Sequence, residues 1–304
     1  MRISFATPGL PEKGVVVVGV LEGRKLTESA QALDNKMSGG LMRAVKASRF
    51  KGSKGQSLPV LAPAGTKLDR VLVMGMGKPA DIDAKAMQAY GGRAYAALAT
   101  KGSTTVQVLI DAVEKGKMRP DEMAAEVALG ARLRSYRFDK YRTKEKPEDK
   151  PSLKTLKIQC KGFAKARTAF APMNKIADGV FMTRDLVSEP ANVIYPETLA
   201  KQAQTLSKLG IKVEVLGEAQ MRKLGMGALL GVGQGSDRDS KLVVMRCNGT
   251  KGNAKNAATV ASVGKGVTFD TGGLSIHTSH VTQDMKWYMR RSRTIHGLIM
   301  CCAD

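Results

Sequence analysis

Short apolar runs alternate with longer stretches of amphipathic spacing through the first half of the chain. Val15–Leu21 is almost continuously apolar and predicts a buried strand. The stretch Leu26–Ser48 is mostly polar with spaced apolar residues, and it predicts a helix interrupted near Gly39 and Gly40. The alternation continues with predicted strands at Asp69–Met74, Thr104–Ile110 and Leu153–Cys160 and predicted helices at Ala80–Thr100, Asp121–Ser135 and Ala164–Ser188. This order favours an α/β fold with a largely parallel sheet.

The pattern changes near the middle of the chain. Tyr136–Pro151 is dense in charge and rich in proline near its end, so it predicts an exposed loop at the edge of a first domain. Beyond the helix at Ala164–Ser188 we expect a helix at Glu197–Leu209 and strands at Lys212–Leu216, Lys241–Arg246 and Thr259–Val263. A length of 304 residues fits about two domains. We therefore predict one domain at residues 1–165 and a second at residues 166–304.

The composition gives a formal net charge of +22, and this charge is spread evenly along the chain. Each stretch of about fifty residues contributes +3 or +4. A nucleic-acid-binding module or a basic tail would concentrate its charge, so the bias indicates a generally basic surface with weak, non-specific attraction to polyanions. Aromatic residues make up only 5% of the chain, which argues against a protein that stacks the bases of single strands.

Four cysteines and an N-terminus without an apolar core limit the cellular setting. Cys160, Cys247, Cys301 and Cys302 show no C-x-x-C spacing, so we expect neither a disulfide scaffold nor a cysteine-rich zinc module. No signal peptide and no membrane span are predicted. The sequence therefore favours a reducing, cytoplasmic location.

Two glycine-rich segments invite comparison with phosphate-binding loops. Gly75 and Gly77 follow a predicted strand, but Ala80 stands where the full dinucleotide motif has a third glycine, which favours a tight strand-to-helix turn. Gly225–Gly235 lacks the Lys-Ser/Thr of a P-loop, which excludes that motif.

His277 and His280 form an H-x-x-H pair. Such a pair can bind a metal ion, but a zinc site needs further ligands, and adjacent cysteines such as Cys301 and Cys302 rarely bind one ion together. Solvated histidines and a cysteine pair near the chain end are therefore the favoured interpretation.

The segment Val263–Ile276, VGKGVTFDTGGLSI, carries more specific information. Lys265 lies between two glycines, and Asp270 precedes Gly272 and Gly273, so small residues leave room for a ligand near the backbone. A bend at Gly266 would turn Lys265 and Asp270 towards one point. Asp270 is then a hard oxygen ligand for a metal ion and Lys265 an electrophile or an amine ligand. The alternative is a glycine-flanked turn with a surface lysine and aspartate.

This segment closely resembles the signature of the leucyl aminopeptidase (cytosol aminopeptidase) family of two-metal exopeptidases. The resemblance extends to four further segments, TRDLVSEPANVIYPETLA at Thr183–Ala200, SRFKGSKGQ at Ser48–Gln56, DRVLVMGMGK at Asp69–Lys78 and SYRFDKYRTK at Ser135–Lys144. It therefore covers both halves of the chain.

The resemblance implies a mixed α/β N-terminal domain followed by an α/β metallopeptidase domain. It implies a cytoplasmic hydrolase that forms homo-hexamers and releases N-terminal residues, leucine among them, from peptides in intracellular protein turnover. Two divalent ions, zinc or manganese, would activate a water and polarise the scissile carbonyl. By position, Lys265 and Asp270 match two of the family's metal ligands, and Lys265 would have to be deprotonated to bind a metal ion.

The sequence departs from the family pattern after Ile276. His277 occupies the position of the family's catalytic lysine, and Tyr288 that of a metal-binding aspartate. A neutral phenol is a poor substitute for a carboxylate. Arg290 and Arg291 replace two glycines. The family's later N-T-D-A-E-G-R motif, with further acidic ligands and a catalytic arginine, is absent from these 304 residues.

These departures predict a chain whose second domain is incomplete or degenerate. We therefore expect no competent two-metal centre and no intact catalytic residue in the chain as it stands. The alternatives are a non-catalytic protein that binds nucleic acid or a protein partner, and a remnant without function.

Overall fold

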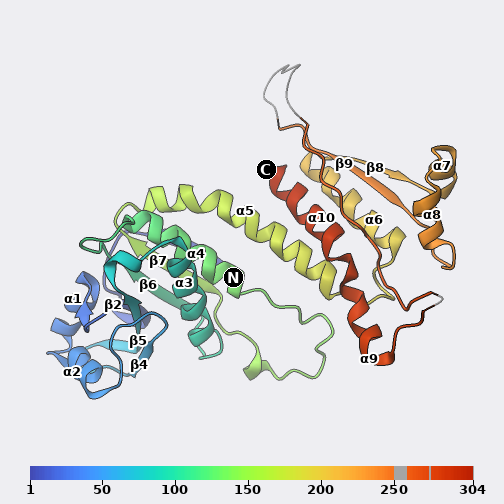
Figure 1. Ribbon diagram of the computed structural model, residues 1–304. Coiled ribbons are helices and arrows are strands. Elements are labelled where there is room, and N and C mark those ends of the chain that lie inside the picture. The colour runs from blue at the N-terminus through green and yellow to red at the C-terminus, as the bar shows by residue number, and fades with distance from the viewer. Residues whose placement is uncertain (250–258, 274, 304) are drawn as a thin grey trace. The chain divides into compact units, whose positions relative to one another are not determined.

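The computed structural model describes residues 1–249, 259–273 and 275–303 (Figure 1). The chain divides into two compact units, Met1–Asn174 and Lys175–Asp304. This division lies inside helix α5 (Phe163–Ser188), as does the predicted domain boundary after residue 165. The assignment of domains to 1–165 and 166–304 remains a proposal.

A seven-stranded sheet forms the centre of the first unit. Its strands lie in the order β1-β7-β6-β2-β5-β4, with β3 beside β2. The pairs from β1 across to β5 are parallel, whereas β3 and β4 pair antiparallel with their neighbours. The strands are β1 Arg2–Ala6, β2 Lys13–Leu21, β3 Lys25–Leu26, β4 Ser57–Leu61, β5 Lys67–Gly77, β6 Thr105–Ile110 and β7 Thr155–Cys160. The predicted α/β class with a largely parallel sheet is confirmed.

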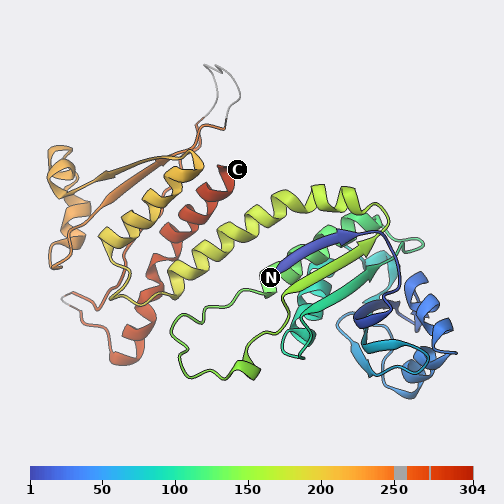
Figure 2. The ribbon, with the colours of Figure 1, turned by 180° about the vertical axis from the view of Figure 1, so that it is seen from behind.

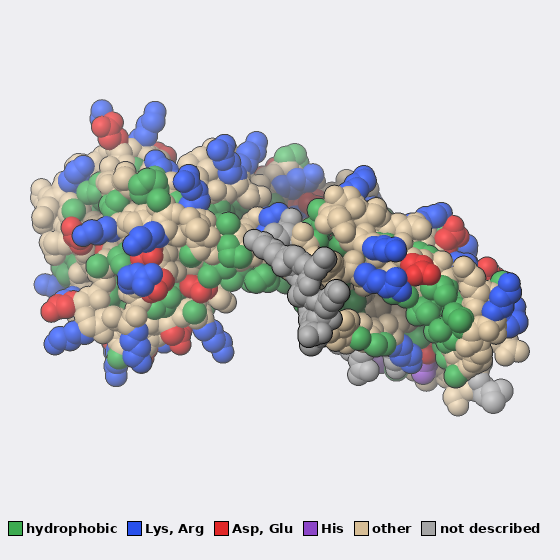
Figure 3. All heavy atoms as spheres, turned by 90° about the horizontal axis from the view of Figure 1, so that it is seen from above, with side chains coloured by type: hydrophobic (Ala, Val, Ile, Leu, Met, Phe, Trp, Pro, Cys, Tyr) green, Lys and Arg blue, Asp and Glu red, His purple; other side chains and the backbone are tan. Residues whose placement is uncertain are grey.

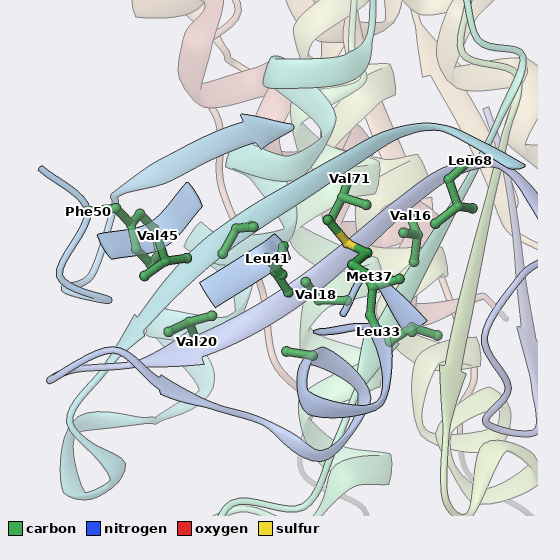
Figure 4. Packing of buried hydrophobic residues seen from close by; sticks show 13 residues of the cluster. Val16, Val18, Val20, Leu33, Met37, Leu41, Val45, Phe50, Leu68 and Val71 are labelled. Carbon is green, nitrogen blue, oxygen red and sulfur yellow. The ribbon is translucent and has the colours of Figure 1, made fainter. Parts of the chain in front are cut away.

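Helices cover both faces of this sheet, and side chains on both faces of β2 are therefore buried. Val16 and Val18 pack with Leu33 and Leu41 of α1 and α2 (Figure 4). Val17, which points to the opposite face, is also fully buried, and α3 and α4 contact β5, β6 and β7. The helices are α1 Glu28–Lys36, α2 Gly40–Ala47, α3 Ala84–Leu98 and α4 Pro120–Arg134, with short 3-10 helices η1 Pro79–Asp81 and η2 Pro147–Asp149. A strand buried on both faces explains the continuous apolar run at the start of the chain.

Helices α3 and α4 approach each other closely at two glycines. A Cβ atom added to Gly91 would lie 2.0 Å from the carbonyl oxygen of Val127, and one added to Gly130 would lie 1.9 Å from that of Gln88. Real Cβ atoms do not come so close to backbone. Any side chain at these positions would therefore force the two helices apart.

The second unit pairs a two-stranded sheet with helices. Strand β8 (Lys212–Leu216) is antiparallel to β9 (Leu242–Arg246), and α6 (Pro196–Thr205) packs on both. The remaining helices are η3 Leu206–Leu209, α7 Glu218–Lys223, α8 Gly227–Gly233, α9 Ser279–Thr282, η4 Gln283–Met289 and α10 Arg290–Cys302. Figures 1 and 2 show α10 running beside α6 and the C-terminal part of α5.

One predicted strand of the second unit is wrong. Residues 259–263 form no strand, and Val260 and Val263 are 88% and 93% exposed. An extended apolar segment becomes a strand only when a neighbouring strand accepts its hydrogen bonds. Within the described ranges, β9 pairs only with β8. Conversely, the short strand β1 was not predicted, because it depends on pairing with β7, which is distant in the sequence.

In the part of the chain that the structure describes, no helix combines the length and apolar character that crossing a bilayer requires.

We predict that Gly130→Ala destabilises the first unit by about 1–3 kcal/mol, since the new methyl group overlaps the backbone of Gln88. Gly92→Ala is the matched control on the facing helix, because its Cβ would come no closer than 3.5 Å to its neighbours. This control should be neutral or slightly stabilising, as alanine favours helix over glycine. Urea unfolding followed by circular dichroism measures both. Equal midpoints for the two variants would contradict the close approach.

Candidate functional site

The candidate site lies in the irregular segment between β9 and α9. Lys265 is exposed, and Asp270 is half-buried. The Oδ1 atom of Asp270 accepts a hydrogen bond from the backbone N–H of Gly272 at 2.8 Å. Across the described residues, no hydrogen bond or ion pair joins Lys265 to Asp270. The structure therefore orients Asp270 through its own loop and leaves the Lys265 side chain facing solvent.

A tight loop brings the backbone around Asp270 close to that of His277. Gly272 and Ile276 form an isolated antiparallel bridge, and the N–H of His277 donates to the carbonyl of Thr271 at 2.9 Å. Gly272 has φ +95°, and a Cβ atom there would lie 2.1 Å from the carbonyl oxygen of Ser275. Glycine is therefore required at this position, and the loop closes because of it.

The loop continues directly into the last helices of the chain. The hydroxyl of Thr282 donates a hydrogen bond to the carbonyl oxygen of His277 at 3.2 Å. Tyr288 lies on η4, but its side chain is outside the described part, as are the side chains of Arg290 and Arg291. On the other side of the loop, a Cβ atom added to Gly266 would lie 3.4 Å from the hydroxyl of Ser292 on α10. The candidate loop thus packs against the first turn of α10.

The residues of this loop do not fit a pair of divalent ions. Two dications need several carboxylates to balance their charge and complete their coordination. Asp270 is the only carboxylate in the loop, and one of its oxygens is already hydrogen-bonded to Gly272. Among the described residues, no three His, Cys, Asp or Glu side chains lie close enough together to hold one ion.

Helix α10 carries an unusual buried cation that was not predicted from the sequence. Arg293 is fully buried, and its Nη2 lies 3.1 Å from the sulfur of Met289. Among the residues that the structure describes, its Nε and Nη1 atoms have no hydrogen-bond partner. Burial lowers the pKa of Arg293 to about 10, an effect that the charge of Glu189 opposes. A guanidinium in this setting has lost its hydration without gaining full hydrogen bonding.

His296 is the second basic residue on the buried face of α10. Its Nδ1 lies 2.9 Å from the carbonyl oxygen of Ser292, which can only accept, so the proton sits on Nδ1. Burial lowers the pKa of His296, and the neighbouring Arg293 lowers it further. Met289, Arg293 and His296 are spaced so that they lie on one face of the helix. This helical spacing was the sequence signal that could have indicated that Arg293 and His296 share a face with the buried Met289.

The described residues do not bring together a phosphate-binding loop at either glycine-rich segment or a zinc site at the histidines and cysteines. A Cβ atom on Gly75 would lie 2.1 Å from the carbonyl oxygen of Ser53, so this glycine permits a close backbone approach at the end of β5. The glycine-rich segment after Gly225 contains the short helix α8. His280 is exposed, and the thiol of Cys301 donates to the carbonyl of Gly297 at 3.1 Å.

Basic residues are dispersed over the face drawn in Figure 3, where Lys and Arg side chains alternate with acidic and apolar ones on both units. This agrees with their even spacing in the sequence.

Two models of one family match the chain. The cytosol aminopeptidase family's N-terminal domain matches residues 17–145, and its catalytic domain matches residues 181–304. The α/β fold and the glycine-flanked loop at Lys265 and Asp270 therefore belong to a known class of α/β peptidases. This chain belongs to the cytosol aminopeptidase family.

Related proteins match the chain along its whole length. It is 42% identical to a probable cytosol aminopeptidase of Caulobacter vibrioides over 100% of this chain and 60% of that protein. It is 43% identical to one of a Bradyrhizobium species, with the same coverage. The chain thus spans about 60% of the length of these curated relatives.

Solved structures show the same fold. A mutant of tomato leucine aminopeptidase aligns with a TM-score of 0.83, at 24% identity, over 100% of this chain and 59% of that chain. The bottromycin maturation enzyme BotP in complex with Mn aligns with a TM-score of 0.75, at 24% identity, over 95% of this chain and 56% of that chain.

We predict that Arg293→Met raises the free energy of unfolding of the second unit by about 1–3 kcal/mol, because an apolar side chain of similar length removes an unpaired buried charge. Lys223→Met, at an exposed position on α7, is the matched control and should change stability by less than about 0.5 kcal/mol. Urea unfolding measures both. A loss of stability in Arg293→Met would show that the guanidinium is stabilised.

We predict that the second unit loses stability as the pH falls below about 6.5, the ordinary pKa of histidine. The folded protein holds His296 neutral, so the unfolded chain binds its proton first, and acid favours unfolding. His296→Gln should flatten this pH dependence, whereas His280→Gln, at an exposed position, should leave it unchanged. Unfolding midpoints measured between pH 5 and 8 give the slopes. Equal slopes for the two variants would refute the assignment to His296.

Proposed function

We propose that this chain carries the framework of a metal-dependent aminopeptidase, of the kind that releases N-terminal residues, leucine among them, from peptides. The observation that supports this most strongly is the segment Val263–Ile276, which carries Lys265 and Asp270 in a chain related over its full length to probable cytosol aminopeptidases. A role in intracellular protein turnover, a cytoplasmic location and a homo-hexameric assembly are parts of the same proposal. Peptides are the proposed substrates.

Lys265 and Asp270 are the proposed metal ligands. In a complete site of this kind manganese or zinc would supply an activated water and a Lewis acid, but Lys265 and Asp270 alone do not hold two such ions. Asp270 is already oriented by the Gly272 N–H, which leaves its second oxygen open. Lys265 faces solvent, so it would have to turn inward and lose its proton to bind a metal ion.

We further propose that the chain as it stands does not turn over peptides. His277 stands in place of the lysine implied by the family pattern, and it differs in reach and in pH dependence. Tyr288 stands in place of an aspartate and supplies no negative charge at neutral pH. Neither the dispersed basic side chains nor the family assignment favours the alternative of nucleic-acid binding.

The test is hydrolysis of leucine amide by the purified chain with added Mn²⁺ or Zn²⁺. We expect no turnover above a metal-only blank. Turnover by the unaltered chain would contradict the proposed inactivity.

A double variant tests the assigned positions independently of activity. His277→Lys combined with Tyr288→Asp should tighten Mn²⁺ binding by about tenfold or more, since the second substitution supplies the carboxylate that the family pattern implies at this position. The control adds Asp270→Asn to the same background and should abolish the gain. A gain that survives this control would place the metal elsewhere.

A further inference from the structure

Two cysteines that are far apart in the sequence meet in the second unit. Cys247 follows β9 directly, and Cys302 is the last residue of α10. The thiol of Cys247 donates a hydrogen bond to the main-chain carbonyl oxygen of Cys302 at 3.3 Å. Figures 1 and 2 both show the C-terminal end of α10 next to the end of β9.

This contact places the Cys247 thiol beside the backbone of Cys302. A carbonyl oxygen lies roughly 2.4 Å from its own Cα, and a cysteine sulfur lies roughly 2.8 Å from its own Cα, so the Cα atoms of Cys247 and Cys302 are at most about 8.5 Å apart. This interval contains the roughly 4.4–6.8 Å that is usual between the Cα atoms of a disulfide. Cys302 is exposed, so neighbouring side chains do not prevent its sulfur from rotating towards Cys247.

The remaining cysteines are held elsewhere. Cys301 points towards α5, because a Cβ atom on Gly179 would lie 2.4 Å from its sulfur, and its thiol donates to the carbonyl of Gly297. Cys160 is fully buried in the first unit, and burial raises its pKa to about 11. A thiol with so high a pKa forms little of the thiolate that reacts. The pairing of Cys247 with Cys302 is therefore selective.

We propose that Cys247 and Cys302 form a reversible disulfide that fixes α10 to the end of β9. The oxidant is a small-molecule disulfide such as oxidised glutathione. The exposed Cys302 thiolate attacks one sulfur of this disulfide and releases one small thiolate. The Cys247 thiolate then attacks the Cys302 sulfur and releases the second. The two protein thiols lose two protons and two electrons, and one small-molecule disulfide becomes two thiols.

The disulfide would affect the stability of α10, the helix that carries the buried Arg293. The bond closes the chain from Cys247 to Cys302, and this stretch includes the candidate loop at Lys265–His277. Cross-linking a long stretch restricts its opened states more than its closed one. Helix α10 holds Arg293 without full hydrogen bonding, so opening of α10 is favoured by rehydration of that charge. The disulfide opposes this opening.

The first experiment identifies the bond. The full chain is reduced, exposed to oxidised glutathione and mapped by mass spectrometry without reduction. We expect a cross-link between the peptide containing Cys247 and the C-terminal peptide. Because Cys301 and Cys302 share a peptide, serine variants assign the partner. Cys302→Ser and Cys247→Ser should lose the cross-link, while Cys301→Ser and Cys160→Ser should keep it. Loss in Cys301→Ser, a bond between Cys301 and Cys302, or a stable glutathione adduct without a cross-link would overturn the pairing.

The second experiment measures the effect on α10. Amide hydrogen exchange in α10 should slow by about tenfold or more on oxidation, both in the unaltered chain and in Cys301→Ser. Cys302→Ser should show no change with oxidant. Unchanged exchange in a chain that is fully cross-linked would overturn the role in holding α10.

Discussion

The close crossing of α5 and α10 is the constraint on which the second unit depends. A Cβ atom on Gly179 would lie 2.5 Å from the carbonyl oxygen of Gly297, and one on Gly297 would lie 2.4 Å from that of Gly179. The hydroxyl of Thr183 lies 3.2 Å from the carbonyl oxygen of Arg293, next to this crossing. Two glycines thus let the helix backbones touch. That contact fixes where each residue of α10 lies, from Ser292 beside the candidate loop to Cys302 beside β9.

The same crossing buries a residue that is poorly suited to the interior. One apolar cluster of this unit, among the residues that the structure describes, consists of Leu186, Ile194, Leu199 and Met289, with Met182 and Val193 packed against it. Arg293 lies one helical turn from Met289, on the same face. Local polarity and global packing conflict at this position, which is uncommon in well-packed cores.

Much of the first unit was predictable from the sequence because its strands are apolar on both faces. Val15–Leu21 could be assigned without tertiary information, and the helices around it followed from their periodicity. Strand β1 could not, since its five residues become a strand only by pairing with β7. Residues 259–263 show the reverse, because their β-forming composition finds no partner strand in the described residues.

The candidate loop was found by its residue types, but its geometry was not. The spacing of Lys265 and Asp270 suggested convergence at a bend near Gly266. The structure instead closes the loop at Gly272 and brings the backbones near Asp270 and His277 together. The burial of Arg293 and His296 was not predictable from the sequence, because burial on a helix face depends on what packs against it.

The proposed lack of a competent two-metal centre can be checked by equilibrium dialysis of the unaltered chain against micromolar Mn²⁺, because dialysis counts bound ions without requiring turnover. We expect fewer than two saturably bound ions per chain. Two ions bound per chain at saturation would show that the centre forms.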